Sequence, residues 1–86
     1  MRILIHSKFK KEYKRLPKQI KELTDKKIVF FFKDPFDSRL KVHRLHGKMD
    51  YLWSFSVDRK YRLIYEILDE KTFRFYTIGT HNDVYR

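Results

Sequence analysis

The hydrophobic pattern of this chain changes at Pro35, and that change restricts the possible folds more than any other feature. Before Pro35, apolar residues recur at helical spacing; Phe9, Tyr13 and Leu16 share one face of a helix whose N-cap is predicted at Ser7. After Pro35, apolar and polar residues alternate as they do in strands. Helices followed by strands predict an α+β fold with the helices on one face of an antiparallel sheet, and argue against a doubly wound parallel sheet.

The helical part is predicted to contain a hairpin of two helices after a short strand. The strand spans residues 2–6, where apolar residues alternate weakly. Pro17 either ends the first helix or occupies the first turn of the second. The apolar run 28–32 would also suit a buried strand, because so short a run does not separate the two periods. We predict helix, since the run continues the spacing of Ile20 and Leu23.

The second part of the chain predicts a short edge strand followed by a three-stranded meander. Residues 42–45 form the edge strand, and residues 61–68 and 72–78 form the last two strands. In 53–57, large apolar residues alternate with two serines, so the serine side is predicted to face water. The same alternation places Trp53 in the core rather than on a surface that stacks nucleobases.

Length and composition limit the chain to one domain, residues 1–86, with a compact core. One Trp, six Tyr and eight Phe supply the large apolar area that so small a domain needs. The absence of cysteine excludes disulfides, thiolate metal sites and thiol nucleophiles, and indicates a reducing compartment. No apolar run approaches the roughly 20 residues of a membrane span, and the N-terminal apolar stretch is too short for a signal peptide. We therefore expect a cytoplasmic protein that does not contact membranes.

Excess positive charge is confined to the first part of the sequence. Residues 1–48 hold fifteen Lys or Arg against five Asp or Glu, whereas residues 49–86 hold six against six, so the whole net charge of +10 arises in the first part. A segregated basic excess is typical of a surface that binds nucleic acid, and Lys18 and Lys21 are predicted to contact RNA from the second helix. A solvated helix face and a dock for an acidic protein are the alternatives.

Catalytic chemistry is predicted on the β part of the chain. With two glycines there is no glycine-rich phosphate loop, and no dinucleotide or zinc-protease motif is present. Cleaving RNA without a metal needs a base for the 2′-hydroxyl, cationic donors for the phosphorane and an acid for the leaving oxygen. His, Arg, Lys and Tyr can fill these roles with no cofactor. The candidate residues for these roles in this part are His43, His46, Ser54, Ser56, Lys60, Arg62, His81, Asp83 and Tyr85.

Three of these residues could have either a functional or a purely structural role. Arg62 lies in an apolar strand, where it either clamps a phosphate or pairs with Glu66 on the same face. Tyr85 either closes the edge of the sheet or contacts a base. His81 follows Gly79 in a polar tail, where a core histidine is unexpected, and this favours a functional role.

The pair His43 and His46 is predicted to contribute at most one residue to the site. Residues three apart in an extended segment point to opposite faces. The two histidines are therefore not expected to share a metal ion, and no metal site is predicted.

Three segments taken together resemble a known family. They are HRLHG at 43–47, WSFSVDRKYRLIY at 53–65 and IGTHNDVY at 78–85. With the predicted order of elements, they resemble the RelE/ParE superfamily of toxins over essentially the whole chain, in particular the RelE and YafQ-like messenger RNA interferases. The resemblance implies a microbial RNase-like fold and a toxin of a type II toxin–antitoxin system. Such a toxin cleaves messenger RNA, commonly on the ribosome, needs no metal or cofactor, and is bound by a small antitoxin protein.

The resemblance also implies roles for individual residues. His43 matches the histidine of the YafQ-like H-x-L-x-G motif, a general base, and Arg62 matches the arginine that stabilises phosphate in RelE-type toxins. His81 matches the histidine of the G-T-H ending, a general acid, and Tyr85 matches the terminal aromatic that contacts the substrate.

The chain departs from the family pattern at two positions. Ser56 stands where YafQ-like toxins carry a further histidine, and Lys60 stands where they carry an aspartate. Ser56, Lys60 and Lys48 are expected to contact RNA. The other functions considered are a ParE-like toxin that poisons DNA gyrase, a non-catalytic RNA- or ribosome-binding protein, and an inactive relic that still binds an antitoxin. The joint presence of the four matched residues argues against the gyrase poison.

Overall fold

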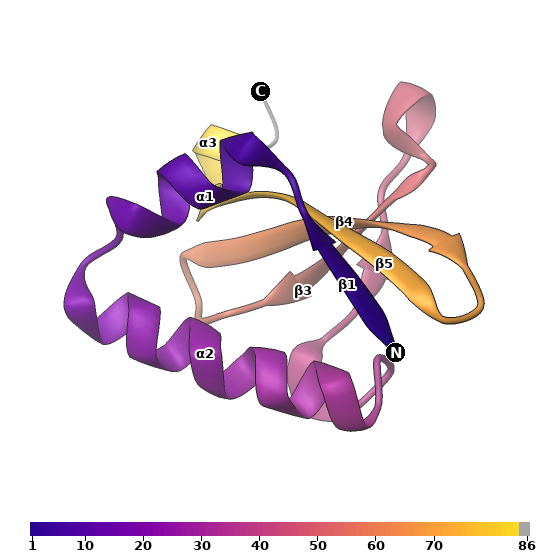
Figure 1. Ribbon diagram of the computed structural model, residues 1–86. Helices are drawn as coiled ribbons and strands as arrows, with labels where there is room; N and C mark the ends of the chain where they lie inside the picture. Colours follow the sequence, from indigo (N-terminus) through magenta and orange to yellow (C-terminus); the bar gives the residue numbers. More distant parts are fainter. Residues whose placement is uncertain (85–86) are drawn as a thin grey trace.

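A computed structural model describes residues 1–84 and has the predicted α+β class (Figure 1). Two helices lie against one face of a five-stranded sheet. None of the helices in this range is long and apolar enough to cross a bilayer. The elements in chain order are β1 (Arg2–Ile5), α1 (Ser7–Lys14), α2 (Lys18–Lys33), the 3-10 turn η1 (Ser38–Leu40), β2 (His43–Arg44), the 3-10 turn η2 (Gly47–Met49), β3 (Leu52–Ser56), β4 (Tyr61–Asp69), β5 (Thr72–Thr80) and α3 (His81–Val84).

The sheet is mixed, which corrects the expectation of a wholly antiparallel one. Its strand order is β1-β5-β4-β3-β2, and the meander β3-β4-β5 and the edge pair β2-β3 are antiparallel as predicted. At the opposite edge, β1 runs parallel to β5, from Arg2 beside Thr72 to Ile5 beside Phe75. The parallel pair arises because α1 and α2 carry the chain across to the far side of the sheet. Two reversals of the meander then bring β5 back alongside β1 (Figure 1).

The two helices begin and end close to the predicted positions. The N-cap of α1 is His6 rather than Ser7: the backbone of His6 is still extended, and its Nδ1 accepts the N–H of Lys8 at 3.0 Å. Pro17 directly precedes α2, and its carbonyl accepts the N–H of Ile20 and of Lys21, each at 3.0 Å. The run 28–32 is helical, which confirms the prediction.

A hydrogen bond joins the two helices. The hydroxyl of Tyr13 on α1 donates to Oδ1 of Asp25 on α2 at 2.6 Å. This bond, with partial burial and the negative charge of Asp25, raises the pKa of Tyr13 to about 12. A polar contact therefore links the two helices of the hairpin.

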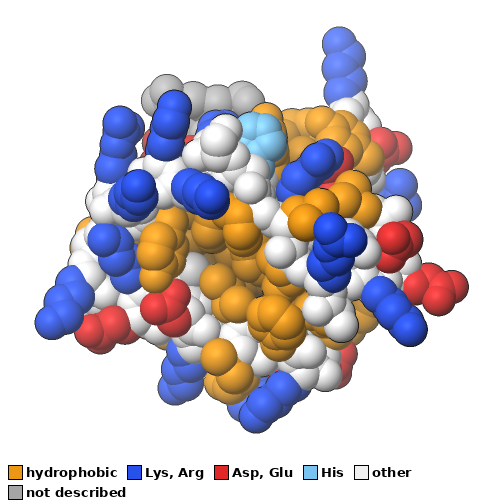
Figure 2. Space-filling view, viewed as in Figure 1, with side chains coloured by type: hydrophobic (Ala, Val, Ile, Leu, Met, Phe, Trp, Pro, Cys, Tyr) orange, Lys and Arg blue, Asp and Glu red, His pale blue; other side chains and the backbone are white. Residues whose placement is uncertain are grey.

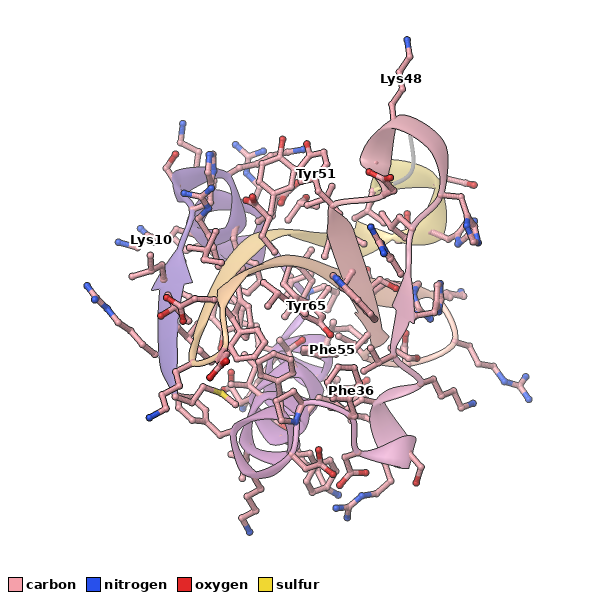
Figure 3. All side chains as sticks on the ribbon, turned by 90° about the vertical axis from the view of Figure 1, so that its right-hand side faces the viewer. Lys10, Phe36, Lys48, Tyr51, Phe55 and Tyr65 are labelled. Atoms are coloured by element: carbon pink, nitrogen blue, oxygen red, sulfur yellow. The ribbon has the colours of Figure 1, made fainter. Side chains whose placement is uncertain are left out.

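Phe31 of α2 lies at the centre of the main core. It is fully buried, and its ring lies 5.0 to 5.6 Å, centroid to centroid, from the rings of Phe55, Tyr65, Phe73 and Phe75 on the sheet. Figure 3 shows Phe55 and Tyr65 between the strands and α2. Trp53 packs against this core, as predicted.

A second, smaller core lies on the other face of the sheet. It contains Leu45, Leu52, Ile64 and Val84. This cluster overturns the prediction that the serine side of β3 faces water, because Ser54 is fully buried and Ser56 is half-buried. The covering residues come from the loop after β2 and from α3, so alternation within β3 alone could not reveal them.

Replacing Tyr65 with phenylalanine is expected to stabilise the domain by about 1 kcal/mol. The hydroxyl of Tyr65 is buried, and within residues 1–84 no protein group bonds to it. Burial raises the pKa of this hydroxyl above its usual range, so it stays neutral, but its desolvation is uncompensated. Urea unfolding of Tyr65→Phe beside the parent measures the difference. A clear loss of stability would show that the hydroxyl is hydrogen-bonded in solution.

Candidate active site

A cavity of about 430 Å³ opens on the face of the sheet opposite α2. Its walls come from β2 and the loop after it, from β4 and from α3. His43, Arg62 and His81, three of the four predicted catalytic residues, meet in this cavity although they are far apart in the sequence. The fourth, Tyr85, lies outside the described residues. The full lining is His43, Arg44, Leu45, His46, Met49, Arg62 and His81.

The guanidinium of Arg62 is held from two sides. Its Nε donates to Oγ of Ser54 at 2.8 Å, and its Nη2 donates to the carbonyl of Lys41 at 3.2 Å. Lys41 has a left-handed backbone, with φ of 49°, at the turn that leads into β2. Nη2 also lies 3.3 Å from Nδ1 of His43. The cation therefore has a fixed position beside a histidine ring.

The alternative role of Arg62, a pair with Glu66, does not occur. Glu66 binds Arg74 instead, with Oε1 at 2.9 Å from Nη2 and at 3.0 Å from Nε. Glu66 pairs with Arg74 rather than with Arg62 because Arg74 lies directly opposite Glu66 in the β4-β5 register. Within residues 1–84, no carboxylate forms an ion pair with Arg62. Its positive charge is therefore unneutralised by the part of the chain that the structure describes.

The surroundings of His43 favour the neutral form of its ring. His43 is exposed, but partial desolvation of its ring, the largest cause, and the positive charge of Arg62 lower the pKa of His43 below its ordinary value of 6.5. A hydrogen bond to the backbone of Lys41 acts in the opposite direction, and the rings of His46 and His81 add small lowering effects. A neutral imidazole can accept a proton, as a general base must.

Both His43 and His46 line the cavity, so the expectation that at most one would do so is wrong. Strand β2 ends at Arg44, and the chain then turns through buried Leu45 into η2, which stops the alternation of an extended strand. Gly47 allows this turn, because its φ is +68°. Among residues 1–84, no group of three or more His, Cys, Asp or Glu is placed so that it could hold a metal ion.

His81 is positioned by a close approach between β5 and α3. Strand β5 continues to Thr80, beyond the predicted end at residue 78, and α3 folds back against it. A Cβ on Gly79 would lie 3.2 Å from Cβ of Asp83 and 3.5 Å from Cγ1 of Val84, so a larger residue there would push α3 slightly away from β5. The N–H of His81 donates to the carbonyl of Lys60 at 3.0 Å.

The predicted RNA contacts are scattered over the molecule. Oγ of Ser56 donates to the carbonyl of Asp58 at 2.8 Å and shapes the turn between β3 and β4. Lys48 projects from the tip of η2 (Figure 3). Lys18 and Lys21 lie on α2, on the opposite face of the sheet from the cavity. Lys60 lines a separate hollow beside His81.

The face formed by α1, α2 and β1 has an apolar middle and a basic rim. Figure 2 shows apolar side chains gathered between these three elements, with Lys and Arg side chains and several Asp and Glu side chains around them. Half-buried apolar residues of this region include Ile3, Leu16, Ile20 and Leu23. Lys and Arg side chains thus surround an apolar area on this face.

The comparison with known families decides the family of the chain. The sequence model of a bacterial toxin of type II toxin–antitoxin systems, YafQ, matches residues 1–86. The chain belongs to the YafQ family of toxins. No curated protein sequence matches it.

Solved structures of YafQ and RelE toxins share the fold of this YafQ-family toxin. YafQ from E. coli strain BL21(DE3) is 22% identical over 100% of both chains, with a TM-score of 0.83. In the E. coli DinJ-YafQ toxin–antitoxin complex, the similar chain is 24% identical over 98% of this chain and 96% of that one, with a TM-score of 0.77. In the archaeal RelE-RelB complex from Pyrococcus horikoshii OT3, identity is 20% over 92% of each chain, with a TM-score of 0.73.

In this YafQ-family toxin, the substitution Arg62→Gln is expected to raise the pKa of His43. Partial desolvation and the charge of Arg62 both disfavour the protonated ring, and the substitution removes the second of these causes. Titration of the histidine ring signals by NMR measures the midpoint. Arg74→Gln, a matched loss of charge at an arginine that pairs with Glu66, should leave the midpoint unchanged. An unmoved midpoint in Arg62→Gln would show that the two side chains do not interact in solution.

Proposed function

We propose that this toxin is an endoribonuclease that cleaves messenger RNA on the ribosome, and hence in the cytoplasm, without a metal or cofactor. The observation that supports this most directly is the meeting of His43, Arg62 and His81 in one cavity. These side chains suit the three tasks of RNA cleavage: accepting a proton, stabilising negative charge and donating a proton.

The reaction assigns one task to each side chain. His43, neutral at neutral pH, accepts the proton of the 2′-hydroxyl as the 2′-oxygen attacks the adjacent phosphorus. Arg62 donates hydrogen bonds to the phosphorane, whose added negative charge it stabilises. His81 gives a proton to the 5′-oxygen as the bond between that oxygen and phosphorus breaks.

The remaining predicted contacts take secondary roles. Lys48 and Lys60 bind backbone phosphates, Ser56 acts through the turn that it shapes, and Tyr85 contacts the substrate. Lys18 and Lys21 attract RNA or ribosome only through long-range charge, because α2 lies on the other face of the sheet.

We also propose that a cognate antitoxin protein binds this toxin. The DinJ-YafQ and RelE-RelB structures are complexes of related toxins with their partners. The face of α1, α2 and β1 suits an acidic, amphipathic segment, since its apolar middle offers burial and its basic rim offers charge pairing (Figure 2). We therefore assign the basic first part of the sequence to antitoxin binding.

The test is brief expression of the chain in bacteria beside His81→Ala, with mapping of new messenger RNA 5′ ends. In-frame new ends with the parent and none with His81→Ala support the proposal, provided that both purified proteins unfold at similar temperatures. Growth arrest without new ends would point to gyrase or another target and contradict it. Absence of arrest, or equal cleavage by both proteins, would also contradict it.

A further inference from the structure

A second hollow lies next to the cavity and shares His81 with it. Its volume is about 360 Å³, and its lining is Arg59, Lys60, Thr80, His81 and Asn82. The residues come from the turn between β3 and β4 and from the junction of β5 with α3. Because His81 lines both spaces, a chain that leaves the cavity past His81 enters this hollow.

The hollow is built from residues with fixed backbone positions. In the turn, Oδ1 of Asp58 accepts the N–H of Lys60 at 2.8 Å and the N–H of Tyr61 at 2.7 Å. The carbonyl of Lys60 accepts the N–H of His81 at 3.0 Å, which ties the turn to the start of α3. The two walls are therefore joined directly, and the distance between them is set without a ligand.

Among the described residues, the lining of the hollow holds two cationic side chains, Arg59 and Lys60, and no carboxylate. The two carboxylates around it are engaged within the fold: Asp58 in the turn, and Asp83 through Oδ2, which accepts the hydroxyl of Thr80 at 2.8 Å. Within residues 1–84, neither Arg59 nor Lys60 forms an ion pair, and both side chains are exposed. Two cations in a lining without a carboxylate favour an anion, and the amide of Asn82 adds neutral donors.

We propose that this hollow is a second RNA subsite, which binds the phosphate on the 3′ side of the nucleotide released by cleavage. The assignment rests on the proposed function, in which His81 protonates the 5′-oxygen of that nucleotide. The nucleotide that carries the leaving oxygen must lie against His81 on the side away from Arg62. The 3′ phosphate of that nucleotide then lies between Arg59 and Lys60. The enzyme thus binds the RNA on both sides of the bond that breaks.

The test compares the affinities of short, uncleavable 2′-O-methyl RNAs for the full-length protein. One oligonucleotide carries an added phosphate at its 3′ end, a second carries it at its 5′ end, and a third carries neither. The variant Arg59→Gln/Lys60→Gln removes two charges at the hollow. Lys26→Gln/Lys33→Gln removes two exposed charges on α2 and is the matched control.

The parent and the control are expected to bind the 3′-phosphorylated RNA roughly tenfold more tightly than the unphosphorylated one. The Arg59→Gln/Lys60→Gln variant should lose most of that gain, and its slope of log affinity against log salt should fall by about 0.7, the value for one phosphate contact on a single strand. An equal gain from the 5′ phosphate, an unchanged gain in the variant, or no binding by the parent would overturn the subsite.

Failure of the proposed function gives a different result. If the parent cleaves no RNA in cells but keeps the gain from the 3′ phosphate, the nuclease proposal fails and the subsite stands as an RNA-binding site. If the parent cleaves RNA but shows no such gain, the nuclease proposal stands and the subsite is overturned.

Discussion

The substitution Arg62→Ala is expected to lower the rate of RNA cleavage by about 100- to 1000-fold. Ser54 and the carbonyl of Lys41 hold the guanidinium, and no carboxylate of residues 1–84 pairs with it, so its charge is available to the phosphorane. A donor that is already in place stabilises the transition state without reorganisation. Single-turnover cleavage of a short RNA, or of messenger RNA on ribosomes, measures the rate.

Two further variants separate charge, geometry and stability. Arg62→Lys keeps the charge but loses the planar fork that bonds Ser54 and Lys41 together, so it should restore only a small part of the rate. Arg74→Ala removes an arginine of the same sheet whose partner is Glu66, and it should cleave like the parent. If Arg62→Ala lowers thermal stability so far that the folded fraction accounts for the lost activity, Arg62 is structural and the proposed role is wrong.

Most helices and strands of the fold could be predicted from the sequence, because each has a local pattern of apolar and polar residues. The helical spacing through 28–32 and the alternation in the meander led to the correct α+β order. The parallel pairing of β1 with β5 left no such signal, because it depends on where α2 returns the chain. Burial of Ser54 was equally hidden, because the second core on its face of the sheet includes Leu45 and Val84, which come from segments outside the meander.

The candidate site could also be predicted only where residue type or a local pattern indicates it. His43, Arg62 and His81 could be selected by residue type and by resemblance, and the structure brings them together. The place of His46 was missed, although Gly47 directly after it marks the turn that moves it into the cavity. Anchoring of Arg62 by Ser54 depends on strand register, and its separation from Glu66 depends on the register of Arg74.

The substitution Phe31→Ala is expected to lower the free energy of unfolding by about 3 to 5 kcal/mol. Phe31 is 0% exposed and touches four aromatic rings of the sheet, so its removal leaves a cavity that rigid strands cannot fill. A domain of this size is stable by roughly 5 to 15 kcal/mol in total, so the loss is a large part of its stability. Urea unfolding followed by circular dichroism measures it.

The neighbouring residue provides the matched control for this prediction. Phe32 is 51% exposed, because a helical turn that points Phe31 at the sheet points Phe32 toward solvent. Phe32→Ala should therefore change stability by only about 0.5 kcal/mol. Equal losses from the two substitutions would contradict the orientation of α2. Phe31 lies on the opposite face of the sheet from His43 and Arg62, so the folded fraction of Phe31→Ala should cleave RNA at the parent's rate. A slower rate per folded molecule would show that the core positions the site.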